Sequence, residues 1–292
     1  MRKLNRRGRS WIVLAPLLMA LGLSVITQPT LGHAFWVQPS SYVAKEDAVI
    51  SFVLKMGEEF EGVEYARTPT HMKSFKLHSL ESAESTPAAQ GSSTGSTGID
   101  VEGRIGRSPA GYIKLANEAA SVVAYASEFS ATTLSNKDFK AYVESEGLGK
   151  QIASTLFQDK SHIRERYARS AKALLVPEGH SGRPVDVATG LSLELVAEET
   201  SLMIEKHQAE RVLNFRLFLE GSPLVGRSVF LERREAKGVV DAQESGTDGR
   251  VAFKIREPGT YLVRAINIVP AQIPGVDFNS QWTSITFAVT RQ

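Results

Sequence analysis

The residue with the clearest chemistry in this chain is His33, in the stretch Gly32-His33-Ala34-Phe35-Trp36. The sequence before it is basic and then apolar, and the sequence after it is rich in strand-forming residues. If an export protease cuts between Gly32 and His33, the new terminal residue carries two adjacent nitrogen donors, its α-amine and its imidazole. Such a pair can chelate a divalent transition metal. The sequence therefore predicts a metal site at His33.

The first 32 residues have the three-part layout of a secretory signal peptide. Residues 2–9 are basic, residues 11–26 are apolar, and residues 27–32 are small and polar. Cuts after Gly32 and after Ala34 both fit the small-residue rule, and the second would remove His33. Retention of the apolar run as a membrane anchor is the alternative. We expect cleavage and a periplasmic or otherwise extracytoplasmic protein.

Composition excludes several classes of site. The 292-residue chain has no cysteine, so it has no disulfide, no thiolate metal site and no cysteine nucleophile. Five of its 34 basic residues and none of its 32 acidic residues lie in residues 1–32, which leaves a net charge of −3 for the rest. A nucleic-acid partner would require a basic face, so we expect none.

The other histidines are not spaced as metal ligands. No His-x-x-x-His or His-Glu-x-x-His pattern occurs. We therefore expect ordinary surface or packing roles for them. These five residues are His71, His78, His162, His180 and His207.

Enzyme signatures are also missing. The sequence contains no phosphate-binding glycine loop and no dinucleotide fingerprint, and its Gly-x-Ser-x-Gly spacing at residues 91–95 lies in a low-complexity run and not at a strand-to-helix elbow. Glu58, Glu59 and Glu61 lie close together, and a solvated turn explains them better than acid–base catalysis does. We expect no enzymatic activity and no organic cofactor.

Arginines and tryptophans supply two further candidates. Arg164, Arg166 and Arg169 could bind an anion, although a solvated helix end paired with Glu165 is the favoured interpretation. Trp36 and Trp282 could stack on a sugar. Because both tryptophans lie in β-rich segments, packing in the core is favoured for them.

β-Branched and aromatic runs separated by turn residues predict strands along most of the chain. Asp248-Gly249 and Pro258-Gly259 are turn signals between such runs. The predicted strands are residues 48–54, 72–80, 112–115, 121–126, 171–176, 191–196, 212–219, 227–232, 251–255, 261–265 and 284–289.

One helix interrupts the strands. Ser135 is a plausible N-cap with Asp138 three residues later, and Phe139, Tyr142 and Val143 share one helical face. Gly147 ends this helix. By contrast, residues 79–98 are a low-complexity run of small polar residues, which predicts a mobile surface loop.

The predicted fold is mainly β, with two Ig-like or transthyretin-like β-sandwich domains and a short helical insertion in the first. Glycines and prolines in residues 177–184 place the domain boundary just beyond that stretch. The predicted divisions are a signal peptide at residues 1–32, an N-terminal domain at 33–185 and a C-terminal domain at 186–292.

Several segments, in order along the chain, resemble an uncharacterised periplasmic family found beside nickel/cobalt energy-coupling-factor transporters. A second set resembles a transthyretin-like β module, and that likeness supports fold and not activity. The first set comprises residues 33–39, 57–62, 139–148, 166–174 and 277–287, and the second comprises residues 221–226, 247–250 and 258–259.

The family resemblance implies an exported, non-enzymatic protein that delivers Ni²⁺ or Co²⁺ to a membrane transporter, with His33 matching the family's leading histidine. This chain has Ala34 where an acidic residue often follows that histidine. It also has Asn267 where many members carry a histidine, and Asn is the poorer ligand for such metals. The alternative function is a non-enzymatic cell-envelope module that recognises protein or glycan through its sandwich loops.

Overall fold

The computed structural model describes residues 33–80 and 98–292, and these residues are mainly β-strand, as predicted. Within these ranges there is one α-helix, and no helix is long and apolar enough to span a membrane. The predicted signal peptide and most of the low-complexity segment lie outside the described residues.

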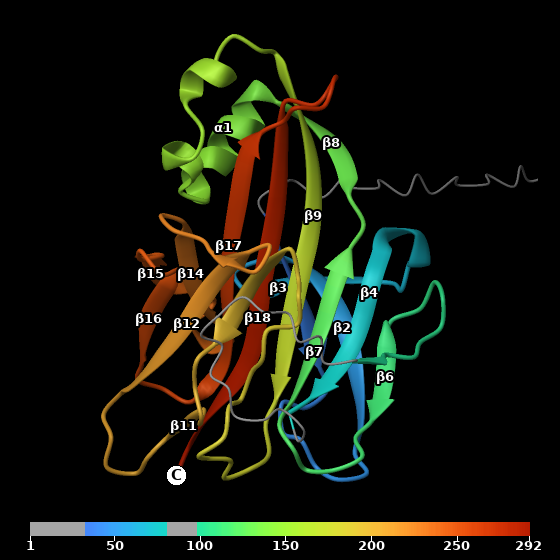
Figure 1. Ribbon diagram of the computed structural model, residues 1–292, viewed down its shortest axis with the longest axis vertical. Coiled ribbons are helices and arrows are strands. Elements are labelled where there is room, and N and C mark those ends of the chain that lie inside the picture. Colours follow the sequence, from blue (N-terminus) through green and yellow to red (C-terminus); the bar gives the residue numbers. More distant parts are fainter. Residues whose placement is uncertain (1–32, 81–97) are drawn as a thin grey trace, which may run out of the picture. The chain divides into compact units, whose positions relative to one another are not determined.

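A ten-stranded sheet dominates the structure (Figure 1). Eight strands follow one another across it, while β8 pairs with β9 and β11 pairs with β18. In spatial order the eight are β15 (Gly238–Glu244), β14 (Ser228–Arg233), β17 (Gly259–Pro270), β18 (Phe278–Arg291), β9 (His162–Leu175), β7 (Ser121–Ser127), β4 (Met72–Ser79) and β5 (Ile99–Asp100); the two others are β8 (Ser130–Ser135) and β11 (Met203–Ile204).

Two four-stranded sheets complete the β-structure. The N-terminal small sheet contains β1 (Ala34–Pro39), β2 (Val49–Glu58), β3 (Glu61–Tyr65) and β6 (Gly111–Lys114). The C-terminal small sheet contains β10 (Leu193–Ala197), β12 (Arg211–Leu219), β13 (Ser222–Pro223) and β16 (Arg250–Ile255).

The two small sheets cover opposite faces of the ten-stranded sheet. Successive side chains of a strand point to opposite faces. On β9, Ala171 and Ala173 belong to the N-terminal core, whereas Leu174 belongs to the C-terminal core. On β18, the Ser284 hydroxyl donates a 2.7 Å hydrogen bond to the Phe35 carbonyl of β1, while Ile285 packs into the C-terminal core.

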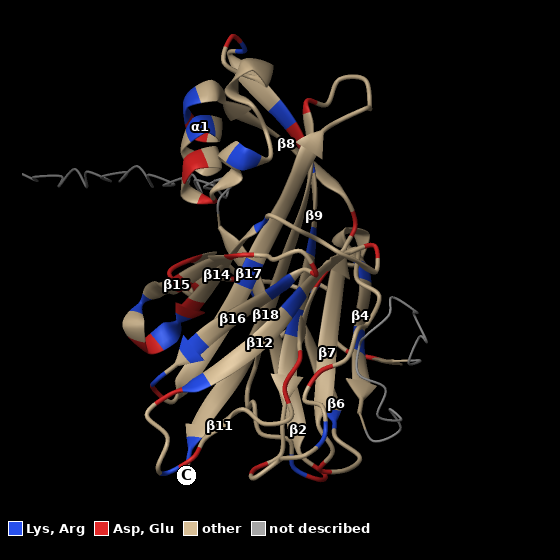
Figure 2. Cartoon of the chain, turned by 60° about the vertical axis from the view of Figure 1, so that its left-hand side comes forward, with Lys and Arg blue, Asp and Glu red and all other residues tan. Residues whose placement is uncertain are grey.

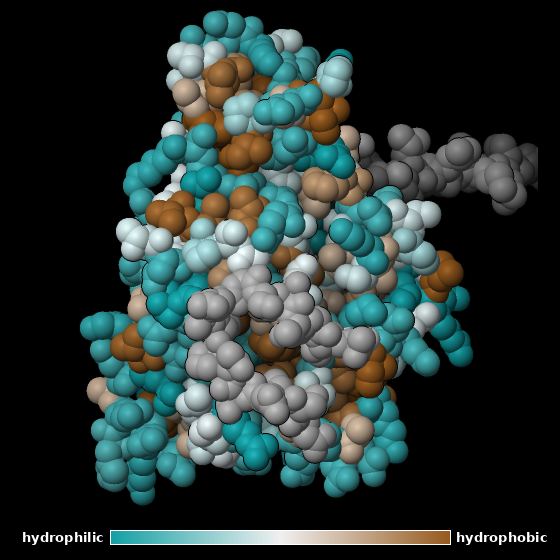
Figure 3. All heavy atoms as spheres, in the orientation of Figure 1, coloured by the Kyte–Doolittle hydropathy of each residue, from teal (hydrophilic) through white to brown (hydrophobic). Residues whose placement is uncertain are grey.

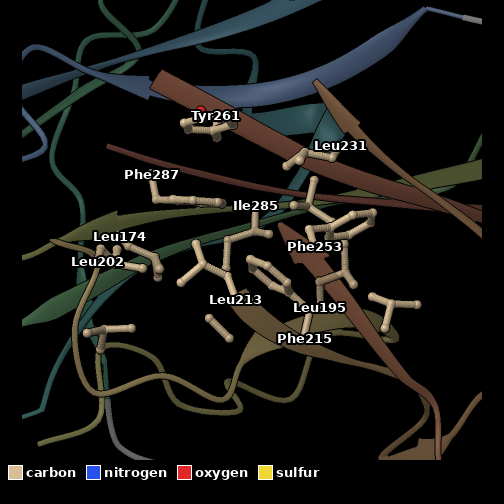
Figure 4. Packing of buried hydrophobic residues seen from close by; sticks show 14 of the residues in the cluster. Leu174, Leu195, Leu202, Leu213, Phe215, Leu231, Phe253, Tyr261, Ile285 and Phe287 are labelled. Carbon is tan, nitrogen blue, oxygen red and sulfur yellow. The ribbon is translucent and has the colours of Figure 1, made fainter. Parts of the chain in front are cut away.

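The C-terminal core lies between the C-terminal small sheet and the adjacent half of the large sheet. Figure 4 shows Leu213 and Phe215 from one layer facing Ile285 and Phe287 from the other. The aromatic rings of Phe215 and Phe287 have their centroids 5.6 Å apart. Burial of such side chains stabilises the fold by about 1.5–3 kcal/mol each.

The two predicted sandwiches therefore share one sheet. Strands β9 and β18 come from the two predicted domains, and they pair in parallel from Phe278↔Glu165 to Thr286↔Ala173. All described residues fall within one compact unit. A domain boundary between residues 185 and 186 implies that the two parts of the chain can fold independently. That boundary stays a prediction.

The helix α1 (Asn136–Ser145) confirms the prediction made from its cap. The Ser135 hydroxyl accepts a 3.1 Å hydrogen bond from the Asp138 amide, and Phe139, Tyr142 and Val143 are the buried residues. They pack on the N-terminal-sheet face of β17 and β18. Short 3-10 turns lie at Pro69–His71 (η1), Leu148–Lys150 (η2), Ser154–Leu156 (η3) and Arg234–Ala236 (η4).

The charged run at residues 164–169 is not a helix end, so that interpretation is wrong. These residues lie in the 14-residue strand β9. Alternation in the strand places Glu165 on the face opposite Arg164 and Arg166. Long-range pairing with β8 and β18 supplies the backbone partners that a local helix would otherwise have provided.

Candidate functional site

His33 directly precedes β1, and strand pairing places it beside Glu58. The register joins Ala34 to Gly57, so His33 lies next to the last residue of β2. Its Nε2 is 3.0 Å from the Glu58 Oε1. The His33 side chain is 25% exposed and that of Glu58 is 69% exposed, so the pair is open to solvent.

A tight turn between β2 and β3 holds Glu58 in place. Glu59 and Phe60 both have positive φ, at 53° and 58°, which is the geometry of a type I′ hairpin turn. Gly57 and Gly62 face each other across the hairpin, and a Cβ on Gly57 would lie 1.9 Å from the Glu61 carbonyl oxygen. The backbones can approach closely because both residues are glycines.

The same turn is fixed onto β1 by aromatic packing. Phe60 is buried against Trp36, with ring centroids 5.4 Å apart in an edge-to-face arrangement. Both rings pack with Ala34 and with Leu262 of β17. Because His33 is one residue from Ala34, this small core limits the movement of the imidazole relative to Glu58.

Beyond Glu58, a second group of charges is buried at the end of α1. The Arg264 guanidinium of β17 donates to Glu146, the C-cap of α1, and to Glu232 Oε1 at 2.5 Å. Burial raises the pKa of Glu146, Arg264 opposes this rise, and the charges of Glu232 and Glu58 add to it. Two carboxyl groups thus share the Arg264 guanidinium, and Glu58, which contacts His33, is a third carboxyl group whose charge acts on Glu146.

The donor chemistry of this site suits a divalent transition metal. Imidazole and carboxylate are common ligands of such ions. Within residues 33–80 and 98–292, however, no three His, Cys, Asp or Glu side chains are arranged to hold a metal. A metal at His33 would therefore depend on a further donor, such as the α-amine of a chain that begins there.

The other histidines do not join His33. His71, His162 and His207 are exposed, His180 is half-buried and His78 is buried. Two of them have local partners: His162 Nδ1 lies 3.1 Å from the Ser161 hydroxyl, and His180 Nε2 lies 3.0 Å from the Arg183 carbonyl oxygen. These positions agree with the surface and packing roles expected from the sequence.

The Asn267 side chain does not face the His33 site. It is buried, and its Oδ1 accepts a 2.9 Å hydrogen bond from Arg227 Nε. On β17, residue 267 points to the face opposite Leu262, which packs beside β1. Its amide oxygen is already engaged by Arg227, so Asn267 does not extend the His33 site.

The two tryptophans belong to the core. Trp36 is fully buried and Trp282 is 4% exposed. The indole of Trp282 stacks on Tyr142 of α1, with centroids 5.5 Å apart. A sugar-stacking face at these residues is excluded by their burial, and the core-packing interpretation is confirmed.

Sequence reasoning missed a buried carboxyl group at Glu165. Burial raises its pKa to about 7, although the Ser280 hydroxyl, which donates to it, Arg169 and Tyr142 oppose the rise. Interpreting residues 162–175 as a strand would have found it, because Glu165 shares a face with Ile163, Ala171 and Ala173. The surrounding charges instead suggested a solvated helix end.

Lysine and arginine residues are interspersed with aspartate and glutamate residues over the described surface (Figure 2). On the face shown in Figure 3, apolar side chains form separate small areas among polar ones.

Comparison with family models identifies the chain. It belongs to the family described as "Domain of unknown function (DUF4198)", whose model matches residues 30–268. That range includes His33, α1 and most of the ten-stranded sheet. No curated protein matches the chain.

Solved structures give only distant similarities. The D0-D1 domain of Intimin has 13% identity and a TM-score of 0.21, covering 86% of this chain and 96% of that one. The human OSCAR ligand-binding domain has 12% identity and a TM-score of 0.22, covering 88% and 99%. The BSP domain of a biofilm associated protein has 12% identity and a TM-score of 0.22, covering 91% and 53%.

Proposed function

We propose that this chain is an exported, non-enzymatic accessory protein that binds a divalent transition metal through His33. The observation that carries the proposal is the 3.0 Å contact between His33 Nε2 and Glu58 Oε1. Histidines that ligate metals usually donate their other ring N–H to a carboxylate, which orients the ring and raises its basicity. Glu58 is placed to accept that bond.

The contact with Glu58 selects one tautomer of the imidazole. When Nε2 carries the proton that Glu58 accepts, the lone pair of the neutral ring is on Nδ1. In a chain that begins at His33, Nδ1 and the α-amine belong to the same residue and can close one chelate ring around a metal. The side chain is one-quarter exposed, which leaves a route for the ion.

The surrounding charge favours a cation. The carboxyl groups of Glu58, Glu146 and Glu232 outnumber two guanidinium groups, that of Arg264, which pairs with Glu146 and Glu232, and that of Arg234, which lies over the Phe60 ring. A divalent ion near His33 would be attracted by the excess, and the attraction is stronger for partly buried groups than for exposed ones. The site therefore supports metal binding beyond the two nitrogen donors.

We further propose nickel or cobalt as the ion, and a membrane metal transporter as the partner. The support is the family resemblance, whose segments converge near His33. Residues 57–62 form the turn that carries Glu58, and residues 139–148 include Glu146. Residues 277–287 belong largely to β18, which hydrogen-bonds to β1 through Ser284. The transthyretin-like likeness of the C-terminal half supports only its β-fold.

Calorimetric titration tests this proposal. A chain that begins at His33 is titrated with Ni²⁺, Co²⁺ and Cu²⁺, beside the variants His33→Ala and His71→Ala. We expect micromolar or tighter binding of at least one ion to the unsubstituted chain and to His71→Ala, and loss of that binding in His33→Ala. Equal binding by His33→Ala, or no binding by any form, would contradict the proposal and favour a module that binds through its sandwich loops.

A further inference from the structure

Lys172 is a buried lysine in the middle of the structure. It lies on β9 and, like Leu174, faces the C-terminal core. None of its side chain is exposed. Its Nζ is 2.6 Å from Asp186 Oδ1 and 3.2 Å from Glu194 Oε1, and it also donates to the carbonyl oxygens of Val187 and Leu195. Lysine is almost never fully buried unless it is paired, and here its partners are two carboxyl groups.

Asp186 is as deeply buried as Lys172. Its Oδ1 accepts a 2.7 Å hydrogen bond from the Val187 amide, and its Oδ2 accepts one of 2.9 Å from the Ala197 amide. The carboxyl group is thus held still, with one N–H directed at each oxygen. Two such donors can stabilise negative charge that develops on the group during a reaction.

Glu194 is the third member of this cluster. Its Oε1 accepts hydrogen bonds from the amide and the hydroxyl of Thr189, and its Oε2 accepts from the amides of Gly190 and Leu191. The side chain is 4% exposed. Glu194 therefore presents a fixed carboxylate to the Lys172 nitrogen in a site that excludes bulk water.

We propose that Lys172 and Asp186 are joined by an intramolecular isopeptide bond, which forms autocatalytically with Glu194 as the group that transfers protons. The three groups occupy one sealed space, and the nucleophile, the electrophile and the base are already in contact. This bond would be a modification of the folded chain, independent of the metal site at His33.

The reaction is a condensation that releases one water. A proton moves from the Lys172 ammonium to Asp186, which gives an amine and a carboxylic acid. The Nζ lone pair then attacks Cγ of Asp186 and forms the C–N bond. Glu194 takes a proton from the nitrogen and passes it to the departing hydroxyl, so that the C–O bond breaks and water leaves. No oxidant, reductant or cofactor is required.

The environment favours the protonated form of Asp186, which this reaction needs as its electrophile. Burial raises the pKa of Asp186, with Lys172 opposing the rise. Burial also acts to lower the pKa of Lys172, although the two carboxylates outweigh it and raise that pKa overall. Burying a charged group costs free energy because the group loses its hydration. Proton transfer from Lys172 to Asp186 neutralises both groups and so removes part of that cost. Lys172 Nζ lies 2.6 Å from Asp186 Oδ1, so the amine and the carboxyl group that it would attack are held together before the reaction.

The bond would connect two layers of the fold. Lys172 belongs to the ten-stranded sheet, and Asp186 lies in the segment that leads into β10 of the C-terminal small sheet. A covalent link here would fasten the C-terminal sandwich across its core. It would also close the loop at residues 173–185, which contains the predicted domain boundary.

Trypsin digestion of the full exported protein followed by mass spectrometry tests the bond. Without the bond, trypsin cuts after Lys172, and because Pro184 follows Arg183 the next fragment runs from residue 173 to 206. With the bond, Lys172 is blocked, and we expect one fragment of residues 170–206, lighter than its linear form by one water. A free 173–206 fragment as the main species would overturn the proposal.

Two substitutions test the roles of Asp186 and Glu194, and the quantity measured is the mass of the tryptic fragment. In Asp186→Asn the same link can form with loss of ammonia, so a fragment of unchanged linked mass is expected. In Glu194→Gln, which keeps one of the two oxygens that accept from the backbone, we expect the separate 173–206 fragment. A fully linked Glu194→Gln protein would overturn the role of Glu194. The unsubstituted digest decides the existence of the bond even if a variant fails to fold.

Discussion

Two groups of buried charges lie on opposite faces of the ten-stranded sheet, and they differ in their neighbours. The Lys172–Asp186–Glu194 group is sealed, with side chains no more than 4% exposed. The Glu146–Arg264–Glu232 group is itself no more than 12% exposed, but the charge of Glu58 acts on it, and Glu58 is 69% exposed in its pair with His33.

This difference favours a structural role for the Lys172 group and a binding role for the His33–Glu58 pair. A sealed cluster with one cation for two carboxylates cannot exchange ligands with solvent, so its chemistry is limited to its own members. The His33–Glu58 pair is open to solvent, with side chains 25% and 69% exposed. The proposed metal site requires such access.

The largest expected effect is at the sealed cluster. Lys172→Met would remove the proposed link to Asp186 and leave the Asp186 and Glu194 carboxyl groups buried with no nitrogen partner from residue 172, which should lower the free energy of unfolding by about 3–5 kcal/mol. Urea denaturation measures the loss. The matched control is Lys150→Ala, whose pair with Glu244 is exposed and should contribute about 0–1 kcal/mol. Similar losses of unfolding free energy in both variants would contradict the distinction between the buried Lys172 group and an exposed ion pair.

Glu165 should make stability depend on pH. Because its pKa rises to about 7 on folding, the folded state binds more protons than the unfolded state between the ordinary glutamate pKa and about 7. Stability therefore falls as the pH rises through that window, by about 3 kcal/mol for this group. Glu165→Gln should remove this part of the decline in urea titrations at pH 5 and 7.5, whereas the exposed Glu144→Gln should not. A Glu165→Gln protein with an unchanged pH dependence would argue against the raised pKa.

At the His33–Glu58 pair, the expected effect is on the affinity for a metal ion. Glu58→Gln should weaken metal binding by about 10- to 100-fold, because it removes the carboxylate that orients the His33 ring. Calorimetry on the chain that begins at His33 measures this change. Glu61→Gln, an exposed change on the same turn, is the control and should bind as the unsubstituted chain does. Equal weakening by both would indicate a general charge effect and no specific role for Glu58.

The smallest expected effect is at the start of α1. Ser135→Ala removes the hydroxyl that accepts from the Asp138 amide and should cost about 1 kcal/mol of stability. Since Glu146 is the C-cap of α1, the variant also tests whether the helix holds the Glu146–Arg264–Glu232 group in place. Lys137→Ala, at an exposed helical position, should be close to neutral in the same thermal denaturation. A neutral Ser135→Ala would show that the cap contributes little.

Local patterns in the sequence predicted local structure well. The cap at Ser135, the buried face of α1 and most strands needed only neighbouring residues, and the structure agrees with them. Alternation along β9 would have indicated Glu165 as buried, but the surrounding charges hid the strand. Lys172 could not be found in this way, because its burial follows from β9 lying at the centre of a sheet whose neighbours, β7 and β18, are distant in sequence. Likewise, the contact of His33 with Glu58 depends on the register of β1 with β2.

The central claim is that His33 binds a metal with both its ring and its own α-amine. Calorimetric titration with Ni²⁺ and Co²⁺ of two otherwise identical chains, one beginning at His33 and one at Gln28, separates these donors because the second keeps the imidazole and removes the amine. We predict micromolar or tighter binding by the first chain and at least tenfold weaker binding by the second. Equal affinities, or no heat of binding with either chain, would contradict the account.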